Sequence, residues 1–356
     1  MNVSLWIVWE ALAKLAKTLS VFVPVLGLSS AELIEPKESR GSETYVPRPY
    51  MRVERSDNGE VALQIAARKF VVPGRKAPEV WLVGVSHVGE TNYYRTLQKF
   101  LDKQALVLFE GVGYDPRVGF KAPKDSEDSE SAGLQATLAE SLGLAFQLEA
   151  IEYDRSNFRN SDISLRDLER LLTPEPEEGS VAGNPGSGGE TNPEFVALLE
   201  AMDGSSWTGK LLHMGIKFLG ANPKLKAMTR LMLVEMLGQI EGDIAQLQGV
   251  PPDLQELMRV LIQSRNKVVL EDVRKAIQKK SPPTSVAVFY GAAHMADMEK
   301  RLKAEFDMDS EEETWFSAVS LNAGEGGLST TEAAMVSGMV RLQMNMLRQQ
   351  MASPSN

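Results

Sequence analysis

The chain has 356 residues, of which 43% are hydrophobic and 24% charged, a composition typical of a globular protein with a substantial core. Its formal net charge of −10 leaves no basic surplus to neutralise phosphates, so we expect no nucleic-acid partner. The sequence contains no cysteine, which excludes disulfides, thiolate metal sites and cysteine nucleophiles. Any metal ion would therefore be held by His, Asp or Glu.

The N-terminal residues 1–31 have features of an export signal. Lys14 and Lys17 precede a short apolar run, and Ser29-Ser30-Ala31 are small residues suited to signal-peptidase cleavage. We therefore predict a periplasmic or extracellular protein. The alternative is an amphipathic surface helix or a membrane-lying anchor, and without a signal function the protein would be cytoplasmic. Both apolar runs are shorter than the ~20 residues of a membrane span, so only this segment is expected to contact a membrane.

The rest of the chain is expected to form a single domain with appended ends. Residues 32–58 predict an extended segment, residues 59–325 the domain, and residues 326–356 a C-terminal amphipathic helix and tail. Within the domain, residues 173–193 are rich in Gly, Pro, Ser and Glu, a composition that predicts a flexible insertion. Residues 194–279 show mostly helical periodicity with methionine-rich apolar stripes, which are typical of an adaptable core.

The first half of the domain alternates between strand and helix patterns. The stretches 60–72 and 79–85 predict two strands joined by a hairpin connection, "PGRKAP". The stretch "TNYYRTLQKFLDK" (91–103) predicts a helix packed by one face, and "ALVLFEGVGYD" (105–115) opens with another apolar strand. This order indicates a βαβ unit with parallel strands.

Two stretches far apart in the chain share one pattern. "VWLVGVSHVGET" (Val80–Thr91) and "VAVFYGAAHMADMEKRL" (Val286–Leu302) each show an apolar strand, Gly-x-x-His and then a helical segment. The third histidine, His213, lies on an apolar helical stretch and is expected in the core. The pattern predicts an α/β fold with a mixed, mainly parallel-core sheet flanked by helices. A helical insertion would separate the two strand–Gly-x-x-His–helix units.

Three polar residues are predicted to meet at one rim of this sheet. In a parallel sheet the carboxyl ends of the strands share one edge, where ligands bind. His87 and His294 each follow a predicted strand, and Glu110 ends a third. Gly84 and Gly291, three residues before the histidines, permit a tight strand exit and close approach of the backbone.

Two imidazoles and a carboxylate suit a divalent cation such as Zn²⁺, Mn²⁺ or Co²⁺, with positions left open for water. A metal-bound water loses a proton near neutral pH and becomes a nucleophile for hydrolysis. In a competing interpretation, a His–Glu pair activates water or a substrate hydroxyl without a metal. In a purely structural interpretation, the histidines are hydrogen-bonded strand caps and Glu110 caps the turn at Gly111.

The ordered set of motifs resembles the TraB/GumN family, which is related to the Tiki metalloproteases and more distantly to erythromycin-esterase and ChaN-like proteins. The matching motifs are "GVSH" (Gly84–His87), "FEGV" with Glu110, and "GAAH" (Gly291–His294). The resemblance extends over Pro78–Leu302, apart from the loop insertions.

The resemblance implies a metal-dependent hydrolase of the peptidase type, acting on a peptide or a small ester or amide. His87, Glu110 and His294 would hold an Mn, Co or Zn ion. Arg155 would stabilise negative charge on the substrate or the transition state. Because ChaN-like relatives bind haem, the alternatives are a non-catalytic haem- or metal-binding protein and a metal-independent His/Glu esterase.

Two further stretches resemble family segments and leave the roles of four charged residues open. "YDRSNFRNSDIS" (153–164) contains Asp154, Arg155 and Asp162, and "SRNKVVLEDV" (264–273) contains Arg265. Arg155 is either the charge-stabilising residue or part of a surface salt bridge. The two aspartates are either outer-sphere partners of the site or turn and cap residues. Arg265 either pairs with a carboxylate near the site or solvates a helix end.

Overall fold

The computed structural model describes residues 45–111, 140–164, 167, 221–239 and 259–352. Several predictions lie outside these residues, namely the export signal at 1–31, the insertion at 173–193, His213 and much of the helical segment 194–279. In the described part of the chain, no helix is both long and apolar enough to cross a membrane.

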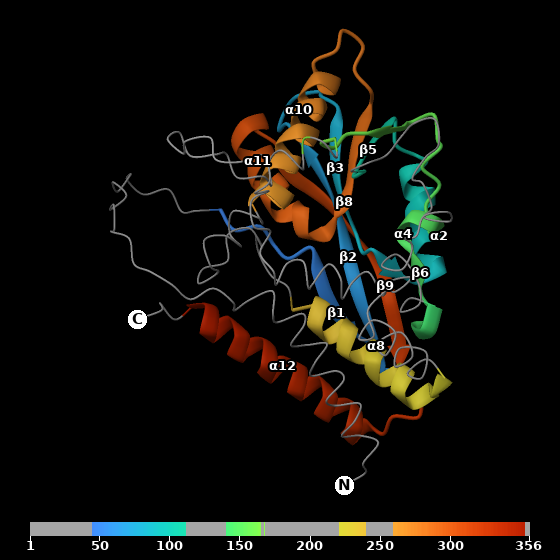
Figure 1. Cartoon of the computed structure of the whole chain (residues 1–356). Helices are drawn as coiled ribbons and strands as arrows, with labels where there is room; N and C mark the ends of the chain where they lie inside the picture. The colour runs from blue at the N-terminus through green and yellow to red at the C-terminus, as the bar shows by residue number, and fades with distance from the viewer. Residues whose placement is uncertain (1–44, 112–139, 165–166, 168–220, 240–258, 353–356) are drawn as a thin grey trace, which may run out of the picture.

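A seven-stranded mixed sheet forms the centre of the molecule (Figure 1). Its parallel half contains β3 (Glu79–Val85), β8 (Ser285–Gly291), β5 (Leu106–Phe109) and β7 (Phe158–Asn160), which are neighbours in that order. The predicted α/β fold with a parallel core is therefore confirmed. The predicted parallel orientation of the βαβ unit is also confirmed, although β8 lies between its two strands.

The other half of the sheet is antiparallel. Strand β2 (Glu60–Val71) pairs with β3 through the predicted hairpin, and on its other side with the long strand β9 (Asp309–Asn322). Strand β1 (Met51–Arg55) pairs with the first half of β2. A separate two-stranded sheet joins β4 (Val88–Gly89) to β6 (Ala145–Phe146).

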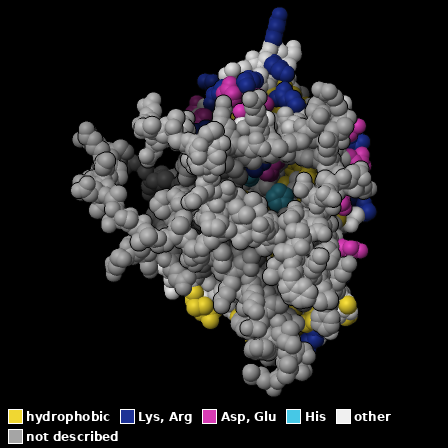
Figure 2. All heavy atoms as spheres, viewed as in Figure 1, with side chains coloured by type: hydrophobic (Ala, Val, Ile, Leu, Met, Phe, Trp, Pro, Cys, Tyr) yellow, Lys and Arg dark blue, Asp and Glu magenta, His cyan; other side chains and the backbone are white. Residues whose placement is uncertain are grey.

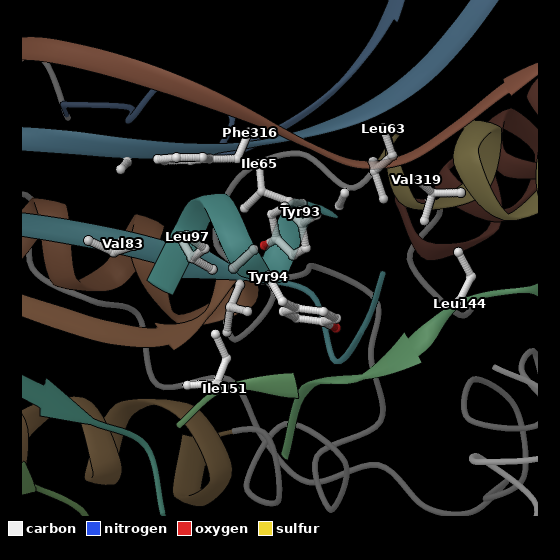
Figure 3. Packing of buried hydrophobic residues seen from close by; sticks show 14 of the residues in the cluster. Leu63, Ile65, Val83, Tyr93, Tyr94, Leu97, Leu144, Ile151, Phe316 and Val319 are labelled. Atoms are coloured by element: carbon white, nitrogen blue, oxygen red, sulfur yellow. The ribbon is translucent and has the colours of Figure 1, made fainter. Parts of the chain in front are cut away.

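Helices cover both faces of the sheet because its parallel strands are apolar on both sides. On one face of the sheet, side chains that include Val83, Phe109 and Phe289 pack against α2 (Thr91–Leu101) and α8 (Pro223–Leu237). Figure 3 shows Val83 next to Leu97 of α2. The predicted apolar face of α2 is confirmed, since Tyr94, Leu97 and Leu101 are fully buried.

On the other face, side chains that include Leu82, Leu108 and Val288 pack against α10 (Arg265–Ile277) and α11 (Met295–Phe306). These two helices lie together on one side of the sheet (Figure 1). The remaining described helical elements are α4, η2, η3 and α12, which span Gln147–Ala150, Arg259–Ser264, Ala292–His294 and Thr330–Ala352. The predicted C-terminal helix is therefore present, and α12 packs against α8. The helices cover the two faces of the sheet, and the predicted site residues lie at the carboxyl ends of its parallel strands.

Candidate functional site

The three residues predicted at the rim surround Gly291, the last residue of β8. His87 follows β3, Glu110 follows β5, and His294 ends the short helix η3 after β8. A Cβ atom placed on Gly291 would lie 3.4 Å from Glu110 Oε2, 3.7 Å from His294 Cδ2 and 3.8 Å from His87 Nε2. The fold therefore brings both imidazoles and the carboxylate to one small space that the missing glycine side chain leaves open.

His294 is buried, with 4% of its surface exposed, and its orientation is fixed by Asn266. Its Nδ1 lies 2.7 Å from Asn266 Oδ1, while the amide nitrogen of Asn266 donates to Asp297 and to the His294 carbonyl. Because the amide nitrogen is already donating, Asn266 Oδ1 is the acceptor and His294 Nδ1 carries the proton. The unprotonated Nε2 then faces Glu110 Oε1 at 3.8 Å.

His87 is exposed, and an equivalent contact orients it. Its Nδ1 lies 3.0 Å from Gln147 Oε1, and Gln147 Nε2 donates to the hydroxyl of Tyr153 at 2.9 Å. With Gln147 Oε1 as the acceptor, the proton lies on His87 Nδ1 and Nε2 keeps its lone pair. The small β4–β6 sheet and a backbone hydrogen bond from Gln147 to the His87 carbonyl hold the two segments together.

Glu110 is held by contacts to both carboxylate oxygens. Oε2 accepts the Gly291 N–H at 2.8 Å, and Oε1 accepts from Arg265 Nη2 at 2.6 Å. Arg265 also forms a forked contact with Asp162, at 3.0 Å and 2.6 Å. Of the two interpretations of Arg265, the structure thus shows the pairing with a carboxylate near the site.

The surroundings of Glu110 and His294 shift the pKa of both side chains. Burial alone would raise the pKa of Glu110, but the charges of His294 and Arg265 and the Gly291 N–H lower that pKa to about 2. Burial lowers the pKa of His294 to about 4, against the opposing effect of Glu110. At neutral pH Glu110 is therefore ionised and His294 is neutral, so Arg265 provides most of the compensating charge.

The donor chemistry fits a divalent cation, since an ionised carboxylate faces two imidazoles with unprotonated Nε2 atoms. The spacing is looser than in a formed metal centre, and among the described residues no group of three or more His, Asp or Glu side chains is spaced to hold an ion. His294 Nε2 and Glu110 Oε1 are 3.8 Å apart. Two ligands of a tetrahedral zinc ion are about 3.4 Å apart.

Arg155 lies outside this cluster. Its guanidinium pairs with Glu152 at 2.8 Å and with Asp102 at 3.6 Å, and its side chain is 39% exposed. Of the two interpretations of Arg155, this geometry corresponds to the surface salt bridge. Asp154 is likewise exposed. Asp162, in contrast, accepts from Arg265 and from the Gly111 N–H, so it is an outer-sphere partner of Glu110.

Sequence reasoning missed the two amides that orient the histidines. Gln147 lies in no recognisable motif, and Asn266 is marked in the sequence only as the residue after Arg265 in the stretch "SRNKVVLEDV". The ring of Tyr290 was also missed; it packs edge-on against the His294 ring at 5.3 Å. Histidine side chains are visible on one face of the molecule, next to hydrophobic groups (Figure 2).

The chain matches no protein-family model, no curated protein and no solved structure. The functional interpretation therefore depends on the motifs of the chain and on the geometry described above.

Proposed function

We propose that the protein is a metal-dependent hydrolase of the TraB/GumN and Tiki type, which cleaves a peptide or a small ester or amide. The main support is the arrangement around Gly291, where two Nε2 lone pairs and one ionised carboxylate face the same small space. In this proposal His87, His294 and Glu110 hold an Mn, Co or Zn ion. Arg155, at the surface, has no part in the site.

Each surrounding residue has a distinct role in this proposal. The bound ion would supply a water of lowered pKa and polarise the scissile carbonyl. Gln147 and Asn266 keep the histidine protons on Nδ1, so that both Nε2 atoms remain available. Arg265 and the Gly291 N–H orient the Glu110 carboxylate. His87 is the exposed member of the set, and substrate would therefore approach from its side.

The contact between Arg265 and Glu110 favours a second candidate, a metal-independent esterase. In that case Oε1 of Glu110 stays bound to Arg265. His87 then acts as the base that activates water. A non-catalytic haem- or metal-binding protein is the third outcome that the experiment must distinguish.

The proposal is tested with chelator-treated protein and a panel of fluorogenic peptides, esters and anilides. We expect hydrolysis to return on addition of Mn²⁺, Co²⁺ or Zn²⁺ and to be lost in His87→Ala and His294→Ala. His213→Ala is the matched histidine control and should retain activity. Hydrolysis that survives the chelator would contradict the metal and favour the esterase. A Soret band on haem titration, with no hydrolysis of any substrate, would favour the haem-binding protein.

We further propose that residues 1–31 export the protein to the periplasm or the extracellular space and are removed. Support comes only from the lysines, the short apolar run and the small residues at 29–31. Mass spectrometry of the mature protein tests this directly. A mature chain that begins at Met1 would contradict cleavage and leave the surface-helix or membrane-anchor alternative.

A further inference from the structure

A cavity of about 500 Å³ lies against the free edge of β1 and shares no lining residue with the histidine cluster. Arg52 and Val53, which are neighbours in β1, both line it. Because successive side chains of a strand point to opposite faces, a cavity that contacts both lies along the strand edge. Among the described strands β1 pairs only with β2, and Gly238, which follows α8, lies against Val53 in the cavity wall.

The lining of this cavity is strongly basic. It includes two glutamates, Glu235 and Glu313, and five arginines, which are Arg48, Arg52, Arg55, Arg68 and Arg341. We call it the arginine cavity. Its lining has a formal surplus of three positive charges, which Glu54 and Glu299, the partners of Arg52 and Arg68, reduce to one, whereas the whole chain has a net charge of −10. Such a concentration of one sign within an acidic protein is typical of a site that receives the opposite charge.

Internal ion pairs account for only part of this charge. The Arg68 side chain is 1% exposed and binds Glu299 and Glu313, so it belongs to the core of the fold. Glu235, 2% exposed, is held by Arg55 and lies 3.9 Å from Arg341. These contacts explain the two glutamates and Arg68 as structural residues of the cavity wall.

The four other arginines keep donors available for a ligand. Their side chains are between 44% and 64% exposed. Arg48, Arg55 and Arg341 each use one nitrogen in an ion pair, and Arg52 uses Nε toward Gln64 and one Nη toward Glu54, out of the five N–H groups of each guanidinium. The guanidinium of Arg52 also lies 4.1 Å from the centre of the Trp315 ring. This stacking holds the guanidinium in a fixed plane, which reduces the entropy lost when it binds an anion.

We propose that the arginine cavity binds a small molecule with two or more negative charges, of the phosphate-ester or polycarboxylate class. Its volume lies within the range of small-molecule sites. Guanidinium groups form paired hydrogen bonds with both phosphate and carboxylate oxygens, so the two classes share one recognition chemistry. The net negative charge of the chain disfavours an extended polyanion, which would be repelled outside the cavity. The proposal is independent of the hydrolase.

The test uses isothermal titration of the full chain, treated with chelator so that metal at the histidine cluster does not contribute. The probes are pyrophosphate and tricarballylate at constant ionic strength. We expect one of them to bind with one-to-one stoichiometry, and the double variant Arg52→Gln/Arg341→Gln to bind about tenfold more weakly or worse. Tighter binding of pyrophosphate would assign a phosphate ligand, and tighter binding of tricarballylate a carboxylate ligand.

The control is Arg95→Gln, which removes an exposed arginine of α2 that does not line the cavity. It should change the affinity less than about twofold. Circular dichroism must show that the double variant is folded, which is expected because both side chains are about half exposed. The proposal is overturned if neither probe binds, or if the double variant binds as tightly as the unchanged protein.

Discussion

The carboxylate of Glu110 makes a quantitative test of the site possible in metal-free protein. The pKa of this group is lowered from 4.5 to about 2 in the folded chain. At 1.36 kcal/mol per pKa unit the full shift corresponds to about 3 kcal/mol of folding stability. The part due to the charge of His294 is absent at pH 7, where His294 is neutral, so about 1–3 kcal/mol applies there. Because the folded-state pKa is depressed, the stabilisation is fully present above pH 4.5 and is lost as the pH falls toward 2.

Glu110→Gln removes the charge and keeps the shape of the side chain. We expect the variant to be less stable than the unchanged protein by about 1–3 kcal/mol at pH 7, where Arg265 loses its ionised partner. The difference should shrink as the pH falls below 4.5 and Glu110 takes up a proton. His294, whose pKa is lowered to about 4 by burial, causes a separate loss of stability between pH 6.5 and 4. That loss is larger in the variant, because the charge of Glu110 no longer opposes the lowering of the His294 pKa.

The assay is urea unfolding followed by circular dichroism at a series of pH values between 7 and 3. Glu149→Gln is the matched control, since Glu149 is exposed, and it should change the free energy of unfolding by less than about 0.5 kcal/mol. A Glu110→Gln variant as stable as the unchanged protein at pH 7 would refute the electrostatic reasoning. A stability difference that stays constant from pH 7 to pH 3 would refute it equally.

Three further variants separate the site from the fold. A methyl group at Gly291 meets Glu110 Oε2 at an ordinary 3.4 Å, so Gly291→Ala should fold normally but bind metal at least about tenfold more weakly by calorimetry; unchanged affinity would place the ion elsewhere. Gly84→Ala places a Cβ atom 3.0 Å from the Ile65 side chain. It should lower the free energy of unfolding, measured by thermal unfolding, by about 1–3 kcal/mol and leave the metal affinity unchanged. Asn266→Leu removes the acceptor of His294 Nδ1 and should weaken metal binding about 10–100-fold in competition with a chromogenic chelator. Wild-type affinity in that variant would contradict the role of the amide.

Much of the fold could be predicted from local patterns. The hairpin of β2 and β3, the apolar face of α2 and the parallel core follow from alternation, helical periodicity and strand-to-helix order. The position of β8 between β3 and β5 could not be predicted in this way, because strand order depends on contacts between segments about 180–200 residues apart in the chain. The long pairing of β2 with β9 has the same origin.

The candidate site was predictable where a residue ends a strand, and not where it reaches the site from a helix. His87, Glu110 and His294 each follow a recognisable apolar run, so the shared rim of a parallel sheet brings them together. Gln147 and Asn266 belong to helices α4 and α10, and no periodicity marks an amide as the partner of a distant imidazole. Interpreting Arg155 needed the structure for a related reason, because its partners in the surface ion pairs, Asp102 and Glu152, are ordinary charged residues.

The most direct measurement of the central claim is anomalous diffraction from crystals of the protein grown or soaked with Mn²⁺ or Zn²⁺. We predict a single anomalous peak beside Gly291, at about 2 Å from the Nε2 atoms of His87 and His294 and from one oxygen of Glu110. A peak that contacts only one of the two imidazoles, or an empty site at saturating metal with Glu110 still bound to Arg265, would contradict the account.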